Sequence, residues 1–201
     1  MTHPLPDFPP LFPRGEWWRL FFAATLEGAS QAEAICRANA SSGIKPREWL
    51  RFYIAGAAAL SLPVSGGASA LKNRPSTRWT LAPEAQRESR KISATLATAY
   101  GRSPFFHPLR DCFEMPFSSE ELAEGVRASE VCREAFRRVA GVLNLEDTRL
   151  IEALRVRMAD GDGTLGRVCA DSRADFHPDL SIIDTLCRLG PDAIFTLLPS
   201  F

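Results

Sequence analysis

The stretch between Pro83 and Phe106 constrains the fold most, because it carries a helix signal that ends at a defined point. Its apolar residues recur every four positions, at Ile92, Leu96 and Tyr100. This spacing predicts an amphipathic helix. Gly101 suits a C-terminal cap, and the α region is disfavoured for Ser103 because a proline follows it. We therefore expect the helix to end at Tyr100 and the chain to turn sharply before the next aromatic pair.

The turn after this helix allows two interpretations. Adjacent aromatic side chains such as Phe105 and Phe106 typically fill a core after a break in the chain, and we favour this structural interpretation. In the alternative, the turn holds Tyr100, Arg102 and Ser103 at the rim of a pocket. These three residues are then candidates for contact with a substrate.

The charge balance argues against two classes of partner. The chain of 201 residues has 24 basic and 24 acidic side chains, and the two signs are interleaved along the sequence. A nucleic-acid interface or a polybasic membrane patch needs a local excess of Lys and Arg, so we expect neither. No apolar run approaches the roughly 20 residues of a membrane span, and the first residues lack the apolar core of a signal peptide. We expect a cytoplasmic protein.

The five cysteines predict neither a metal site nor a redox pair. They lie far apart, and no Cys-x-x-Cys pair occurs among them. Zinc sites and thiol redox motifs need closely spaced ligands. We therefore expect reduced, mostly buried thiols, no bound metal and no other cofactor.

Turn signals and apolar runs give the expected organisation of the chain. Residues 1–14 are rich in proline, and we expect an extended or mobile N-terminal lead there. Residues 15–201 then form a single domain, in which 118–158 is a helical segment that starts with a capping box. Three further stretches have the apolar or aromatic pattern of strands: residues 48–54, 57–64 and 75–81. We expect residues 194–198 to form a closing strand or a turn. The expected fold class is α/β, with a mixed sheet of about four to six strands flanked by helices.

Two other stretches have both a structural and a functional interpretation. The loop around Gly66 and Gly67 follows an expected strand, and its backbone N–H groups could cradle an anion. It lacks the lysine and hydroxyl of a P-loop, so a plain flexible loop is the favoured interpretation. The adjacent Trp17 and Trp18 could form a platform for stacking on a sugar, although the favoured interpretation places one indole in the core and leaves the other partly exposed.

Four segments, taken in chain order, resemble the WbqC-like protein family of bacteria. They are Lys45 with Arg51, residues 60–64, residues 99–106, and residues 176–184 with Gly190-Pro191. The resemblance spans most of the chain. It implies a role near the biosynthesis of surface polysaccharide, O-antigen or capsule, with a transferase acting on an activated sugar or acyl donor.

The chain departs from this family at two motifs. Trp49 lies in a segment where the family has a richer basic motif, and Ile92 stands where the family has a histidine. An isoleucine cannot transfer a proton or bind a metal. These departures mark a divergent member.

The first functional hypothesis is a transferase-like enzyme that acts on a nucleotide sugar or another small-molecule donor. The candidates for binding the anionic donor carry a positive charge or expose backbone N–H groups: Lys45, Arg51, Gly66 and Gly67. Tyr100 or Ser103 would orient the acceptor, and Asp184 would act as the base.

The second hypothesis is a non-catalytic, degenerate family member that binds a sugar, a nucleotide or a protein partner. The spatial arrangement separates the two hypotheses. The enzyme requires Lys45, Arg51, Tyr100 and Asp184 to converge in one cleft.

Overall fold

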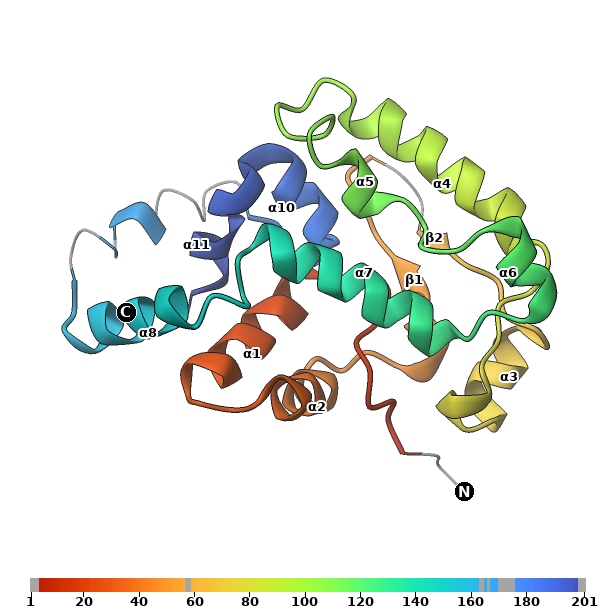
Figure 1. Cartoon of the computed structure of the whole chain (residues 1–201), viewed down its shortest axis with the longest axis horizontal. Coiled ribbons are helices and arrows are strands. Elements are labelled where there is room, and N and C mark those ends of the chain that lie inside the picture. Colours follow the sequence, from red (N-terminus) through yellow and green to blue (C-terminus); the bar gives the residue numbers. More distant parts are fainter. Residues whose placement is uncertain (1–3, 57–58, 163–164, 166, 170–175, 199–201) are drawn as a thin grey trace.

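Helices make up most of the fold in the computed structural model, which describes residues 4–56, 59–162, 165, 167–169 and 176–198. The longer helices are α1 (Gly15–Leu26), α2 (Gln31–Ser41), α4 (Ala85–Tyr100), α7 (Ala128–Val142), α8 (Thr148–Ala159) and α10 (Ile182–Leu189). The shorter helical elements are η1 (Pro46–Glu48), α3 (Gly67–Asn73), η2 (Ser76–Arg78), α5 (Arg110–Phe113), α6 (Ser119–Glu124), η3 (Gly190–Ala193) and α11 (Ile194–Leu197). Helix α7 crosses the middle of the molecule, with α1 and α2 below it and α4 above it in Figure 1.

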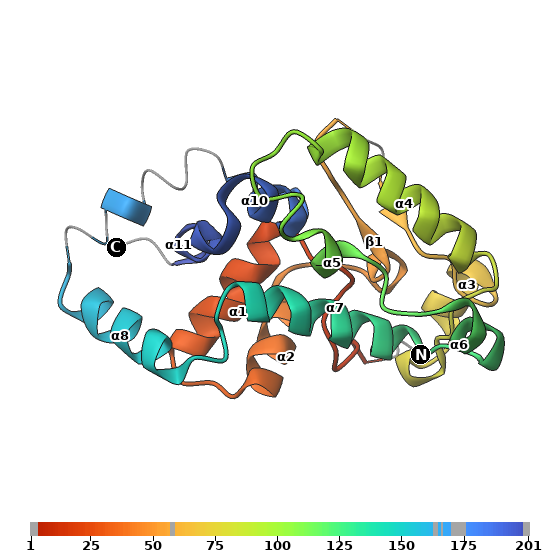
Figure 2. The same ribbon diagram turned by 45° about the horizontal axis from the view of Figure 1, so that its top comes forward.

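Helix α4 confirms the prediction made from the spacing of its apolar residues. It ends at Tyr100 with Gly101 as its C-cap, and Ile92 and Leu96 are buried on the same face. Helices α6, α7 and α8 occupy the segment 118–158, where a helical region was expected, and α8 ends one residue beyond it. Helix α6 begins with the predicted capping box of Ser118. Figures 1 and 2 both place α8 at one end of the molecule and α3 with α6 at the other.

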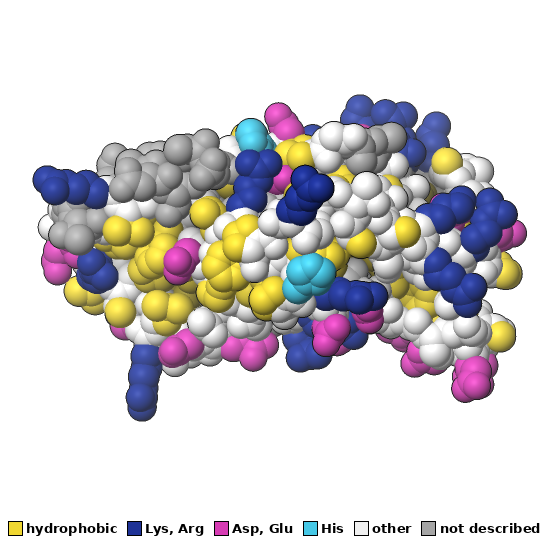
Figure 3. All heavy atoms as spheres, turned by 90° about the horizontal axis from the view of Figure 1, so that it is seen from above, with side chains coloured by type: hydrophobic (Ala, Val, Ile, Leu, Met, Phe, Trp, Pro, Cys, Tyr) yellow, Lys and Arg dark blue, Asp and Glu magenta, His cyan; other side chains and the backbone are white. Residues whose placement is uncertain are grey.

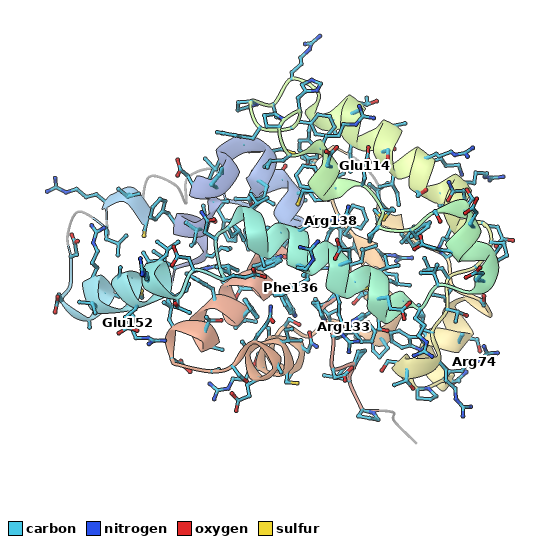
Figure 4. All side chains as sticks on the ribbon, viewed as in Figure 1. Arg74, Glu114, Arg133, Phe136, Arg138 and Glu152 are labelled. Atoms are coloured by element: carbon cyan, nitrogen blue, oxygen red, sulfur yellow. The ribbon has the colours of Figure 1, made fainter. Side chains whose placement is uncertain are left out.

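The two tryptophans of α1 belong to the core. The ring of Trp18 stacks on Phe136 of α7 with 5.0 Å between centroids, and Phe136 is labelled on that helix in Figure 4. Trp17 donates a hydrogen bond from Nε1 to Oδ1 of Asn39 on α2 at 2.9 Å. Both indoles are fully buried. The sugar-stacking platform is therefore wrong, and the expectation that one indole is partly exposed is wrong as well, because both belong to the core.

The described part of the N-terminal segment is extended but packed. Residues 4–13 contain no helix or strand, yet Phe8, Leu11 and Phe12 are buried in the main core. The backbone N–H of Leu11 donates to the carbonyl oxygen of Trp49 at 2.8 Å. The prediction of a mobile, unpacked lead is therefore wrong for these residues. The prolines of the segment prevent regular structure, but its apolar side chains fix it against the domain.

The expected sheet of four to six strands is wrong. The described residues contain one antiparallel pair, β1 (Arg51–Phe52) and β2 (Leu60–Ser61), and three isolated bridges. The stretch 75–81 begins with η2, and the stretch 194–198 contains α11. Residues 57 and 58 of the expected strand 57–64 lie outside the described residues.

Prolines and burial explain why these runs do not form a sheet. Pro63 follows β2 after one residue and has no N–H to continue a ladder. Pro46 is the first residue of η1, and Pro75 directly precedes η2. Aromatic residues of these runs pack against the extended N-terminal segment rather than against other strands, since Phe8 meets Trp49 and Trp79 edge-on and Phe12 meets Phe52. A short apolar run is compatible with either environment, so periodicity could not separate them.

Within the described ranges, none of the helices combines the length and the apolar character needed to cross a membrane.

Candidate functional site

The predicted site residues do not meet in one place. Tyr100 and Asp184 form a cluster in the interior, whereas Lys45 lies on the surface beside η1. Arg51 is exposed on β1, and Gly66 with Gly67 lies at the start of α3. The arrangement that the enzyme hypothesis requires is therefore absent from the described structure.

The interior cluster joins α4 to α10 through one carboxylate. The hydroxyl of Tyr100 donates to Oδ1 of Asp184 at 2.9 Å, and the backbone N–H of Ala55 donates to the same hydroxyl at 3.2 Å. Arg188 lies one turn further along α10, with Nη2 3.3 Å from Oδ1 and Nε 3.3 Å from Oδ2 of Asp184. The Oδ2 atom has no hydrogen bond of good geometry to the described residues, so its partner is the charge of Arg188.

Burial makes this cluster structural rather than reactive. The side chain of Asp184 is 0% exposed. Desolvation raises the pKa of the Tyr100 hydroxyl well above its usual value of 10.0, and the nearby Asp184 carboxylate raises it further, against the opposite effect of the Ala55 N–H. Tyr100 thus remains a neutral hydrogen-bond donor near neutral pH. The cluster fastens α4, α10 and the chain after β1 to one another.

The turn after α4 packs its aromatic residues and leaves Arg102 at the surface. The N–H of Ser103 donates to the carbonyl oxygen of Tyr100 at 2.8 Å, which closes the predicted turn. Phe106 is buried, and Phe105 lies so close to Gly190 that a Cβ there would come within 2.6 Å of the ring. The favoured interpretation as core is confirmed for Phe106, whereas Phe105 is only partly buried.

The glycine loop has a supporting role next to a cationic side chain. Gly66 and Gly67 have φ values of +89° and +62°, which favour glycine. The N–H of Gly67 donates to the carbonyl oxygen of Val64 at 2.9 Å, so this amide is already used within the protein. A Cβ on Gly66 would lie 3.5 Å from Nη2 of Arg74. The bare backbone at Gly66 therefore leaves room for the Arg74 guanidinium.

Four cations line a single cavity of about 700 Å³, which we call the basic groove. They come from two short segments, η1 with its N-cap and α3 with its C-cap: Lys45, Arg47, Lys72 and Arg74. Arg74 is labelled at the end of α3 in Figure 4. All four residues are exposed, and none has a carboxylate within 4.0 Å among the described residues.

The remaining walls of the basic groove are mostly apolar. Pro4 and Pro6 of the N-terminal segment line it together with Leu71 and Trp79. Two contacts fix the position of the Trp79 indole. Its Nε1 donates to the carbonyl oxygen of Arg74 at 3.1 Å, and its ring packs edge-on against Phe8 with 6.2 Å between centroids. The groove thus combines unpaired positive charge with a supported apolar wall.

A second depression of the surface, beside α5, is lined by a cation that has partners within the protein. This cation is Arg138, whose guanidinium donates to the carbonyl oxygens of Asp111 and Glu114 at 3.0 and 3.1 Å and to Glu134 at 2.9 Å. Hydrogen bonds from Arg137 and Arg138 lower the pKa of Glu134 to about 2. On the face seen from above in Figure 3, basic and acidic side chains are likewise mixed. The basic groove differs from the depression beside α5 because its four cations have no carboxylate partner among the described residues.

Sequence reasoning found only Lys45 of the four cations. A signal for the others is present, since the pattern Lys-x-Arg occurs twice, at residues 45–47 with a proline inside it and at residues 72–74 with a proline directly after it. Proline limits the local backbone at both motifs. The sequence spacing does not show that the two motifs lie side by side. Their proximity is seen only in the folded structure.

Comparisons with models of protein families, with curated proteins and with solved structures find no match to this chain. The resemblance to the WbqC-like family therefore stays a prediction. No group of three or more His, Cys, Asp or Glu side chains in the described part of the chain is arranged to hold a metal ion.

Proposed function

We propose that this protein is a binding module for a small phosphate-bearing ligand, with the basic groove as its site. One observation carries the proposal: four cations without an anionic partner in the described structure line one cavity of about 700 Å³. This volume falls within the range of about 300–1,000 Å³ that is typical of small-molecule sites.

Electrostatics favours an anion in this groove. Cations gathered without carboxylates repel one another, and a bound anion relieves that repulsion. The guanidinium groups of Arg47 and Arg74 can each form two parallel hydrogen bonds to phosphate oxygens, while Lys45 and Lys72 act as point charges. Two adjacent phosphates would match four cations better than a single carboxylate.

The binding role follows the second of the two hypotheses from the sequence. Lys45 remains a binding residue in this proposal, but Tyr100 and Asp184 hold the interior together and do not line the basic groove. The transferase activity, the nucleotide-sugar donor and the association with surface polysaccharide remain predictions from the family resemblance. Among the described residues that line the basic groove there is no acidic, histidine or cysteine side chain.

Isothermal titration calorimetry with inorganic pyrophosphate tests the proposal. We expect saturable binding to the wild-type chain, and a loss of affinity of about tenfold or more in the double variant Lys72→Ala/Arg74→Ala. Arg90→Ala is the matched control, because Arg90 is also exposed and unpaired among the described residues but lies on α4. It should leave the affinity unchanged.

Salt provides a second readout on the same samples. Exposed charges are screened over about 8 Å at physiological ionic strength, so affinity should fall as sodium chloride is raised. Absence of pyrophosphate binding to the wild type, or equal binding by the double variant, would overturn the proposal.

A further inference from the structure

We propose that the ligand of the basic groove is a nucleoside diphosphate, and that the N-terminal segment is the element that selects it. This inference rests on the proposed function and deepens it. The segment concerned is residues 4–13, which we call the N-terminal strap. It supplies two prolines to the same groove that the four cations line.

The N-terminal strap is anchored at its backbone by a buried amide. Nδ2 of Asn39 donates to the carbonyl oxygens of Pro6 and Phe8 at 2.9 and 3.1 Å, and Oδ1 of Asn39 accepts from Trp17 at 2.9 Å. Asn39 is only 2% exposed. One side chain therefore ties the strap to both α1 and α2, next to the point where Pro4 and Pro6 line the groove.

Aromatic contacts fix the strap from a second direction. Phe8 packs edge-on against Trp49 at 6.3 Å and against Trp79, which itself lines the basic groove. Arg133 of α7, labelled in Figure 4, lies with its guanidinium carbon 5.7 Å from the Phe8 ring centroid and forms an ion pair with Asp7 at 3.5 Å. The prolines are thus held on a rigid support before any ligand binds, which lowers the ordering cost of binding.

The chemistry of the two walls defines the ligand class. Phosphate oxygens need charged or N–H donors, which the four cations supply and proline lacks. Pro4 and Pro6 offer flat C–H surface, and with Leu71 they favour an apolar, planar group beside the phosphates. A nucleobase attached to two phosphates meets both requirements. Bare pyrophosphate uses only the cationic wall.

Titration calorimetry with two ligands, uridine diphosphate and pyrophosphate, tests this inference. The wild type should bind uridine diphosphate about tenfold more tightly, since burial of part of an aromatic ring contributes roughly that factor. Pro4→Gly should reduce this preference about threefold and leave the pyrophosphate affinity unchanged. Pro4 is exposed, so this variant is expected to fold. Pro108→Gly is the control, because Pro108 is exposed outside the groove.

Asn39→Ala provides a second variant that acts on the strap without touching the groove. It should lower the preference for uridine diphosphate further, because both anchoring hydrogen bonds to the strap are lost. Circular dichroism confirms that the variant is folded. A folded Asn39→Ala protein that keeps the full preference counts against the role of the strap.

The outcomes separate the inference from the proposed function. The inference is wrong if pyrophosphate binds but uridine diphosphate binds no more tightly, or if Pro4→Gly lowers the affinity for both ligands equally. In either case the basic groove remains the proposed binding site for an anion. If pyrophosphate does not bind to the wild type, both are wrong.

Discussion

Two groups of charged side chains in this protein have opposite surroundings. In the interior, Asp184 is fully buried, accepts a hydrogen bond from Tyr100 and faces the charge of Arg188. In the basic groove, four cations lie at the surface without a carboxylate partner among the described residues. The first group is internally satisfied, whereas the second lacks a compensating charge.

This difference assigns the two groups to different tasks. A buried carboxylate reduces the stability of the fold unless a cation and hydrogen bonds compensate its charge. The folded state therefore depends on the partners of Asp184. Exposed cations carry no such cost, because water solvates them. They can stay unpaired until a ligand supplies the negative charge. Stability should therefore depend on the interior cluster and ligand affinity on the basic groove.

The largest expected effect is the loss of stability in Asp184→Ala. The substitution leaves Arg188 and the Tyr100 hydroxyl without their common partner, and breaking a buried pair in this way costs about 3–5 kcal/mol. We expect about 3 kcal/mol, because the Arg188 side chain is 36% exposed and can turn toward water. Urea denaturation followed by circular dichroism measures the change.

Asp184→Asn is the control for this prediction. It keeps the volume of the side chain and an oxygen that accepts from Tyr100, so its loss of stability should be smaller than that of the alanine variant. Both folded variants should bind pyrophosphate like the wild type. If either variant lost pyrophosphate binding without losing stability, Asp184 would belong to the ligand-binding site.

The next largest effect is a loss of stability in alkaline solution. Burial raises the pKa of the Cys112 and Cys187 thiols from 9.0 to about 12, and it raises the pKa of the Cys132 thiol as well. The unfolded chain then loses thiol protons near pH 9, while the folded chain keeps them. The stabilisation is complete below pH 9 and is lost as pH rises toward 12.

Between pH 9 and pH 10 the free energy of unfolding should fall by about 2–3 kcal/mol, since each of the three thiols contributes about 1 kcal/mol. Urea denaturation at the two pH values measures this slope. Cys132→Ala should reduce the slope by about a third. An unchanged slope in this variant would show that the thiol is not protected by the fold.

The sequence predicted those parts of the fold that depend on neighbouring residues. The period of α4, its stop at Gly101 and the capping box of Ser118 are local signals, and all three are confirmed. The expected sheet is wrong because pairing within the described residues stays short: the run after Gly56 pairs with β1 over two residues and meets the run before Pro83 at a single bridge between Val64 and Leu81. Which neighbour buries an apolar run is decided by tertiary contacts that periodicity does not contain.

The candidate site was predicted only in part, for a similar reason. Lys45 lines the basic groove, but Arg47 and Arg74 were missed although they stand in repeated Lys-x-Arg motifs. Tyr100 and Asp184 do come together over 84 positions of sequence, in a buried bond rather than a cleft. Burial is the property that separates a structural pair from a reactive one, and it cannot be computed from residue types alone.

Tyr100→Phe should have a smaller effect than either change above. The substitution keeps the aromatic ring but removes the hydrogen bond to Asp184 and the acceptor of the Ala55 N–H. We expect a loss of about 1–2 kcal/mol, measured by urea denaturation at pH 7. Thr98→Ala, at an exposed position of the same helix, is the control and should cost less. A loss equal to that of Asp184→Ala would mean that the hydroxyl rather than Arg188 compensates the carboxylate.

The smallest expected effect on stability comes from the basic groove. In Lys72→Ala/Arg74→Ala the free energy of unfolding should stay within about 0.5 kcal/mol of the wild type, as for ordinary surface substitutions. Removing two cations relieves repulsion from Lys45 and Arg47, which offsets the loss of Lys72 from the last turn of α3. The same double variant should lose about tenfold in pyrophosphate affinity. A large loss of stability instead would mean that these cations already have a partner within the protein, and the contrast between the two charged groups would disappear.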